Sequence, residues 1–162
     1  VVIVQHMPDM FTSEFAKNLD SVSKLTVKEA EDKEMLKNDI IYLAKGGKHL
    51  VFEEKQGKVI IKYDDRQPYM GLKPYANYTF CSASDIFKEN VIAVVMTGMG
   101  NDGTKGIQQI KKNGGTTISQ SSKDCILYGM PRAAIESGSI DHVIDLNMIP
   151  EKIFALVNRN PS

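Results

Sequence analysis

The sequence lacks the features that mark several classes of protein. Its two cysteines, Cys81 and Cys125, lie far apart and form no C-x-x-C pair, which argues against a zinc ribbon or a disulfide framework. No apolar run is long enough to cross a bilayer, and the apolar residues 1–4 lack the basic flank of a signal peptide. No cluster of metal-ligating residues stands out. We therefore expect a cytoplasmic protein that binds no metal and does not insert into a membrane.

The chain also lacks an excess of charge of either sign. Its 162 residues include 20 Lys plus Arg and 20 Asp plus Glu, so the formal net charge is zero. A balanced surface does not attract a polyanion, and the composition therefore argues against a dedicated nucleic-acid binder. With 42% hydrophobic and 25% charged residues and no internal repeat, the sequence predicts a single globular domain over residues 1–162.

What is present is an alternation of strand and helix patterns. Short apolar runs at 1–5 and 91–97 are typical of strands buried on both faces. Further strands are predicted at 25–30, 39–47, 116–120 and 142–146, with a hairpin that turns at Gln56-Gly57. Helices are predicted at 10–22 (with Asp9 as its cap), 75–87, 104–113, 129–138 and 149–158. The expected fold class is α/β: a doubly wound, mostly parallel, Rossmann-like sheet with one antiparallel β-hairpin.

A glycine-rich loop follows the second buried strand. Gly98, Gly100 and Gly103 form G-x-G-x-x-G between a strand and a helix, which is the spacing of a dinucleotide-binding fingerprint. The context disfavours a nucleotide, because Asp102 stands at the helix start, where its carboxylate would repel a phosphate. The acidic residue expected at the end of the next strand is also missing, since that strand ends at Gln120. We therefore expect no cofactor, and a nucleotide-binding domain stays an alternative that titration would test.

Asp102 has two interpretations. In one, it caps the following helix by accepting backbone N–H bonds of the first turn. In the other, it acts with His6, which directly follows the first buried strand. Both residues then occupy strand-end loops of one sheet, where a carboxylate can orient an imidazole as a general base. The glycines let the loop turn sharply, so that backbone N–H groups such as that of Met99 face a developing oxyanion.

Five segments resemble the catalytic domain of the bacterial chemotaxis protein-glutamate methylesterase family, the CheB type. They are VVIVQHMP, LTVKEAED, IYLAKGGKHL, TGMGNDG and YGMPRAAIESG, and they run in order over essentially the whole chain. The resemblance implies hydrolysis of glutamate methyl esters, and deamidation of certain glutamines, on the cytoplasmic helices of methyl-accepting chemoreceptors. It also implies a Ser-His-Asp triad in which His6 is the histidine, Asp102 is the aspartate and the amide of Met99 belongs to the oxyanion site.

The chain departs from the family pattern in three places. The family nucleophile lies in an S-T-G-G segment upstream of Q-H-M-P, and no serine of this chain has such a setting. We therefore expect the nucleophilic serine upstream of Val1. We also expect residues 1–162 alone to be inactive and less stable than the intact domain. The stretch Met70-Gly71-Leu72-Lys73-Pro74 and Asn77 replace N-G-H-R-P and a following Asp, which affects the expected substrate groove. The receiver domain of many members is also absent from this chain, although a parent protein could carry one.

Two further interpretations remain open at this stage. A catalytically inactive module of the same fold, which binds a receptor or another partner, is the main alternative to the esterase. His49 precedes the hairpin and is predicted to have a structural role at the surface rather than a role in the site.

Overall fold

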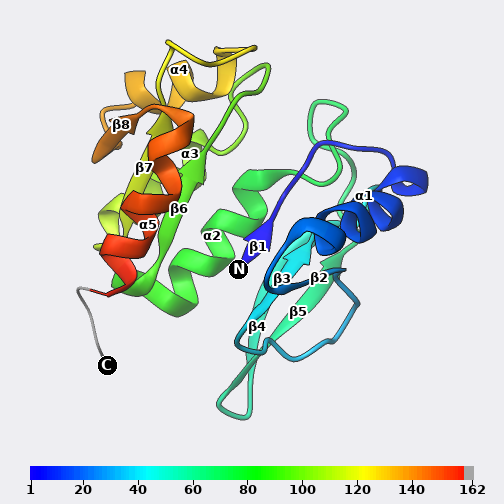
Figure 1. The fold of residues 1–162 in the computed structure, drawn as a ribbon. Helices are drawn as coiled ribbons and strands as arrows, with labels where there is room; N and C mark the ends of the chain where they lie inside the picture. The colour runs from blue at the N-terminus through cyan, green and yellow to red at the C-terminus, as the bar shows by residue number, and fades with distance from the viewer. Residues whose placement is uncertain (159–162) are drawn as a thin grey trace. The chain divides into compact units, whose positions relative to one another are not determined.

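The computed structural model describes residues 1–158. The chain divides into two compact units, Val1–Ile86 and Phe87–Ser162, which we call the N-terminal and the C-terminal unit. Figure 1 shows the order of the helices and strands within each unit.

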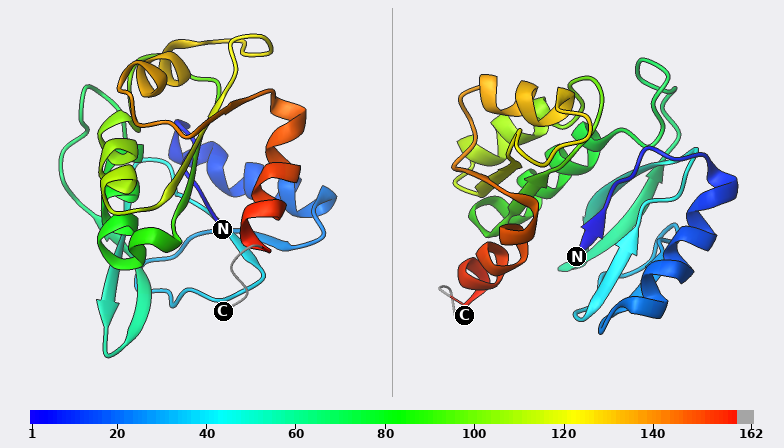
Figure 2. Two further views of the ribbon diagram at one scale, coloured as in Figure 1. Left: turned by 90° about the vertical axis from the view of Figure 1, so that its left-hand side faces the viewer. Right: turned by 45° about the horizontal axis from the view of Figure 1, so that its top comes forward.

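The N-terminal unit contains a three-stranded parallel sheet in the order β1-β3-β2. Its strands are β1 (Val2–Ile3), β2 (Thr26–Glu29) and β3 (Ile40–Leu43). The central strand β3 places Tyr42 and Leu43 in the core, where neither is accessible to solvent. The helix α1 (Asp9–Val22) connects β1 to β2, and the right-hand view of Figure 2 shows it along one face of this sheet.

The start of α1 differs from the expectation by one residue. Asp9 is the first helical residue, and the N-cap position is occupied by Pro8, which makes no side-chain capping bond. The prediction that Asp9 caps this helix is therefore wrong. Pro8 suits the boundary because it has no N–H to satisfy, and the Asp9 carboxylate in the first turn still interacts favourably with the helix dipole.

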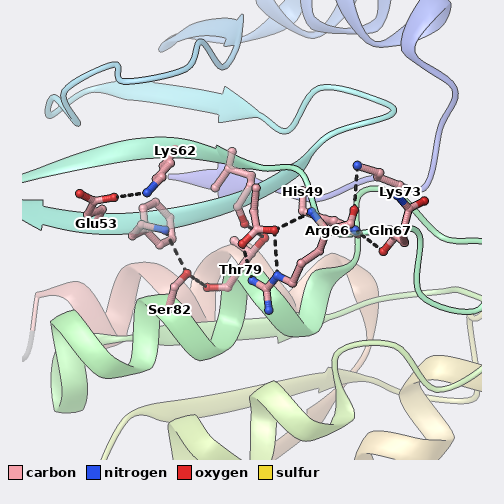
Figure 3. A network of polar contacts seen from close by, with 11 residues as sticks. His49, Glu53, Lys62, Arg66, Gln67, Lys73, Thr79 and Ser82 are labelled. Atoms are coloured by element: carbon pink, nitrogen blue, oxygen red, sulfur yellow. Dashed lines mark hydrogen bonds and ion pairs between the residues drawn. The ribbon is translucent and has the colours of Figure 1, made fainter.

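An antiparallel hairpin and one helix complete the N-terminal unit. The strands β4 (His49–Lys55) and β5 (Lys58–Asp64) pair in antiparallel register. The turn between them has positive φ at Gln56 (53°) and Gly57 (71°), as a two-residue turn of the favoured hairpin type requires, so the predicted hairpin is confirmed. The helix α2 (Ala76–Phe87) joins β4 through two of its side chains: Thr79 Oγ1 donates to Leu50 O at 2.7 Å, and Ser82 Oγ accepts from Phe52 N at 3.0 Å (Figure 3).

The C-terminal unit contains a second three-stranded parallel sheet, in the order β6-β7-β8. Its strands are β6 (Ile92–Val95), β7 (Thr116–Gln120) and β8 (His142–Ile144), and its helices are α3 (Thr104–Lys112), α4 (Gly129–Glu136) and α5 (Ile149–Val157). Two short 3-10 helices, η1 (Lys88–Asn90) and η2 (Leu146–Met148), were not predicted. The left-hand view of Figure 2 shows α3 and α5 on opposite sides of these strands.

The predicted α/β class, with mostly parallel strands and one antiparallel pair, is confirmed. The predicted single sheet differs from the observed arrangement, because the parallel strands within residues 1–158 form two sheets of three. In each sheet one strand that precedes a candidate site loop stands at an edge: β1 pairs only with β3, and β6 pairs only with β7 among the described residues. The parallel strand β7 has the predicted bounds, whereas the other parallel strands are shorter than predicted. For example, β1 extends only as far as its pairing with Tyr42 and Leu43.

Candidate active site

His6 lies in the irregular segment between β1 and α1 and is half-buried. The loop after β3 approaches this segment closely at Gly46, where an added Cβ would lie 2.5 Å from Met7 O and 2.4 Å from Asp9 N. The backbone N–H of Gly46 also donates to Thr12 Oγ1 of α1 at 3.2 Å. The missing side chain at Gly46 therefore allows the contact that supports the turn directly after His6.

Asp102 is buried in the loop between β6 and α3, with 2% of its surface exposed. One carboxylate oxygen accepts the backbone N–H of Gly103 at 2.7 Å. The N-cap of α3 is Gly103, which has a left-handed φ of 88°, so the interpretation of Asp102 as the N-cap residue is wrong. A carboxylate with so little exposure needs partners that stabilise its charge, and the N–H of Gly103 is one of them.

Met99 lies in the same loop, residues 97–103, which we call the site loop. Its side chain is 79% exposed, and Gly100 beside it has a φ of 85°. The glycines of this loop pack against the start of α4: a Cβ on Gly98 would lie 2.4 Å from Met130 Sδ, and one on Gly129 would lie 2.8 Å from Gly100 N. Met130 thus occupies the space that Gly98 leaves, whereas Gly100 and Gly103 adopt the left-handed φ of 85° and 88° that glycine tolerates. Packing and backbone conformation therefore account for the three glycines without a phosphate.

The structure places Met99 and Asp102 together in the site loop of the C-terminal unit. His6 follows β1 in the N-terminal unit. Each predicted residue therefore follows the carboxyl end of a parallel strand, β1 or β6, and both strands stand at the edge of their own sheet.

Four serines near the ends or in the interior of the helices and strands have settings that do not suit a nucleophile. Ser121 follows β7, but its hydroxyl donates to Asp145 Oδ1 at 2.6 Å and accepts from Lys123 N at 3.2 Å. Ser82 and Ser84 lie within α2. Ser119 is fully buried on β7. Within residues 1–158, no serine at a strand end is flanked by glycines.

The prediction that His49 lies at the surface is wrong, because this residue is fully buried. Its Nε2 lies 3.3 Å from Gln67 O (Figure 3). Its ring meets Tyr78 edge to face, with 4.9 Å between the ring centroids. Arg66 stacks on Tyr78, with its Cζ atom 3.7 Å from the centroid of the Tyr78 ring. Burial lowers the pKa of His49. The ring that covers His49 belongs to Tyr78 of α2, 29 residues further along the chain, so no local pattern around His49 indicated its burial.

Two general features bear on what the site can hold. Among residues 1–158, no group of three or more His, Cys, Asp and Glu side chains is arranged to bind a metal ion. None of the helices in that range combines the length and the apolar character needed to cross a membrane.

Comparison with known proteins identifies the family. Residues 1–153 match the family model described as CheB methylesterase. The chain belongs to the CheB methylesterase family. The protein-glutamate methylesterase/protein-glutamine glutaminase of Thermotoga maritima is 44% identical over 157 residues, which cover 97% of this chain and 46% of that protein. The protein of the same name in Pyrococcus horikoshii is also 44% identical and is covered to 43%.

Other CheB relatives give the same picture. A probable protein-glutamate methylesterase of Borreliella burgdorferi is 41% identical, with 97% of this chain and 42% of that protein covered. The chain thus spans less than half the length of these curated relatives. The crystal structure of the Thermotoga maritima CheB methylesterase catalytic domain matches with a TM-score of 0.93 at 44% identity, over 96% of this chain and 82% of that chain. The fold is that of a CheB catalytic domain.

Proposed function

We propose that this chain forms part of a methylesterase domain that hydrolyses glutamate methyl esters, and deamidates glutamines, on the cytoplasmic helices of chemoreceptors. Its membership of the CheB family over residues 1–153 supports this activity. The observation that carries the proposal is the placement of the two motif residues, since His6 and Asp102 lie in the loops that follow β1 and β6, and each of these strands stands at the edge of its sheet. The burial of Asp102 to 2% exposure agrees with a carboxylate that serves an imidazole rather than solvent.

The proposed reaction proceeds through an acyl-enzyme. His6 accepts the proton of a serine hydroxyl, whose oxygen attacks the side-chain carbonyl of the substrate. The proton passes to the leaving oxygen of the ester, which departs as methanol, or to the leaving nitrogen of the glutamine amide, which departs as ammonia. Water then hydrolyses the acyl-enzyme to the glutamate carboxylate and the free serine. Asp102 keeps the imidazole in the correct tautomer and stabilises its cationic form. The N–H of Met99 donates to the oxyanion, which carries more charge in the transition state than in the substrate.

The nucleophilic serine belongs, in this proposal, to a segment outside residues 1–162. The settings of Ser82, Ser84, Ser119 and Ser121 support this assignment, because each hydroxyl lies in a helix, in the core or on a carboxylate. The edge positions of β1 and β6 also support it. A strand edge without a partner leaves backbone N–H and C=O groups that a further strand would pair.

A catalytically inactive binding module is the second candidate. The settings of the described serines favour it, whereas His6 and the buried Asp102 favour catalysis, since a module that only binds has no need of an imidazole base. The two candidates predict the same partner and differ in turnover.

The test uses the full-length protein that contains this chain, incubated with methylated receptor. We expect methanol release by the unmodified protein and none by His6→Ala. His142→Gln provides a matched control, because His142 lies on β8, opposite Ile118, and not in a site loop. Receptor binding without methanol release would support the binding module and would contradict the esterase.

A further inference from the structure

The site loop is attached to the segment between β7 and α4. We call this segment, residues 121–128, the strap. Thr97 Oγ1 donates to Leu127 O at 3.2 Å and accepts from Leu127 N at 2.9 Å. Gly98 N also donates to Leu127 O, at 2.8 Å. The first two residues of the site loop are therefore bonded to the strap through both its N–H and its C=O groups.

The side chain of Gln120 also joins the site loop to the strap. It is the last residue of β7 and is 1% exposed. Its Oε1 accepts the backbone N–H of Thr97 at 2.8 Å. Its Nε2 donates to both the carbonyl oxygen and Oδ1 of Asp124, each at 3.1 Å. Both ends of one buried carboxamide thus contact backbone or carboxylate groups of the site loop and the strap.

The strap is in turn fixed to the end of β8. Ser121 N donates to Ile144 O at 2.8 Å, and Ser121 Oγ donates to Asp145 Oδ1 at 2.6 Å. The second carboxylate oxygen of Asp124 accepts Leu146 N at 2.5 Å. The first half of the strap is therefore held in place by the end of β8. The side-chain amide of Gln120 links this part of the strap to Thr97.

We propose that Gln120 is a positioning residue of the methylesterase site, which holds the site loop so that the Met99 N–H and the Asp102 carboxylate face the reacting groups. The proposal rests on the proposed function. A residue of equal volume without polar atoms would fill the same space in the core, so packing does not account for a carboxamide at this position. The two bonds to Asp124 instead hold the carboxamide in place. The bond from Thr97 N then fixes the direction of that peptide group, two residues before the oxyanion donor Met99.

The effect on catalysis should appear in kcat. A loop that shifts by a fraction of a hydrogen-bond length loses stabilisation that exists only in the transition state, while binding of the receptor helix is retained. We expect Gln120→Met, which keeps the volume and removes the hydrogen bonds, to lower kcat by about 10²-fold with little change in KM. Gln108→Met provides the matched control, because Gln108 is exposed on α3.

Gln120→Glu separates positioning from packing. The ionised glutamate still accepts from Thr97 N, but it faces the carboxylate of Asp124 and cannot donate to it. When protonated, it regains a donor for that contact. We therefore expect the activity of Gln120→Glu, divided by that of the unmodified protein at each pH, to rise as the pH falls. A residue with only a structural role would give a ratio that does not depend on pH.

The experiment measures kcat and KM of the full-length protein and amide hydrogen exchange over residues 97–103. The proposal requires faster exchange of the site loop in Gln120→Met, with β7 unchanged, together with the loss in kcat and the recovery of Gln120→Glu at low pH. Unchanged exchange of the site loop would overturn the proposal, as would a loss of activity matched by a general fall in Tm. An unmodified protein without esterase activity would contradict the proposed function, whereas the exchange data would still decide whether Gln120 holds the loop.

Discussion

At the scale of single residues, burial and a role in the site do not coincide. His49 is fully buried, yet its contacts with Tyr78 and Gln67 belong to the packing of the N-terminal unit. His6 is only half-buried, and its place after β1 is what makes it the candidate base. The sequence predicted the role of neither histidine from its type alone. Position relative to a strand end distinguishes His6, and an aromatic environment distinguishes His49.

The first prediction concerns the coupling of His6 and Asp102. In the full-length protein, we expect His6→Ala to abolish methanol release and Asp102→Asn to reduce kcat by about 10⁴-fold, because the imidazole loses control of its tautomer. The double variant should be little worse than the single variants, since residues that act as one unit give non-additive losses. Losses that add fully, or an active His6→Ala protein, would contradict the assignment.

The second prediction concerns the pH dependence of stability. Burial is the main cause that lowers the pKa of His49 from its ordinary value of 6.5, so the folded protein holds this imidazole neutral. The nearby charges of Lys73 and Arg66 lower the pKa further, whereas the bond to Gln67 and the charge of Asp64 raise it. The unfolded chain binds this proton more readily, so the contribution to stability is present above about pH 6.5 and is lost as the pH falls below it.

Urea unfolding between about pH 7 and pH 5 tests this contribution. We expect the free energy of unfolding of His49→Gln to depend less on pH in this window than that of the unmodified protein. Equal slopes for His49→Gln and the unmodified protein would assign the dependence to other groups.

At the scale of elements, the sequence predicted the type of nearly every helix and strand and the first residues of α3, α4 and α5, but not which residue caps α1 or α3. The hairpin turn could be predicted because Gly57, between two strand-like runs, tolerates the positive φ that the turn requires. Both errors at helix starts are shifts of one residue, with Pro8 in place of Asp9 and Gly103 in place of Asp102. An acidic side chain near a boundary indicates that a helix begins, but backbone geometry decides which residue is the cap.

The third prediction uses the close approach at Gly46. In Gly46→Ala the new Cβ would lie within 2.5 Å of backbone atoms of Met7 and Asp9, and a backbone cannot yield as a flexible side chain can. We expect a loss of about 1–3 kcal/mol in the free energy of unfolding, together with a lower kcat because the segment after His6 must move. Denaturant unfolding and methanol release measure the two effects.

Gly138→Ala is the control for this prediction. Gly138 has a φ of 71° and open space around it, so alanine there costs only the backbone strain of about 1 kcal/mol. It should leave kcat unchanged. Equal effects of the two substitutions on kcat would show that Gly46 does not support the His6 segment.

At the scale of the whole molecule, the order of the motifs along the chain was sufficient to predict the family and the fold class. The alternation of strands and helices predicted parallel sheets, and the match to the Thermotoga maritima catalytic domain confirms that fold. The division into two three-stranded sheets was not predictable, because periodicity indicates that a segment is a strand but not which neighbour it pairs with. Likewise, the contacts of Gln120 depend on where the strap passes, which no local pattern encodes.

The last prediction concerns the chain of residues 1–162 expressed alone. Ser82 and Ser84 lie in a helix, Ser119 in the core and Ser121 on a carboxylate, and no serine at a strand end of residues 1–158 is flanked by glycines. We therefore expect no methanol release from methylated receptor, because His6 and Asp102 activate water far less well than a serine hydroxyl. A peptide with the sequence that precedes Val1 in the parent protein should restore activity if it supplies both a strand and the nucleophile, and should raise Tm by pairing an edge strand. The same peptide with alanine in place of its serine is the control, and it should raise Tm without restoring activity. Full activity of residues 1–162 alone would show that the chain contains its own nucleophile, and Ser121 and Ser122 would be the first residues to replace.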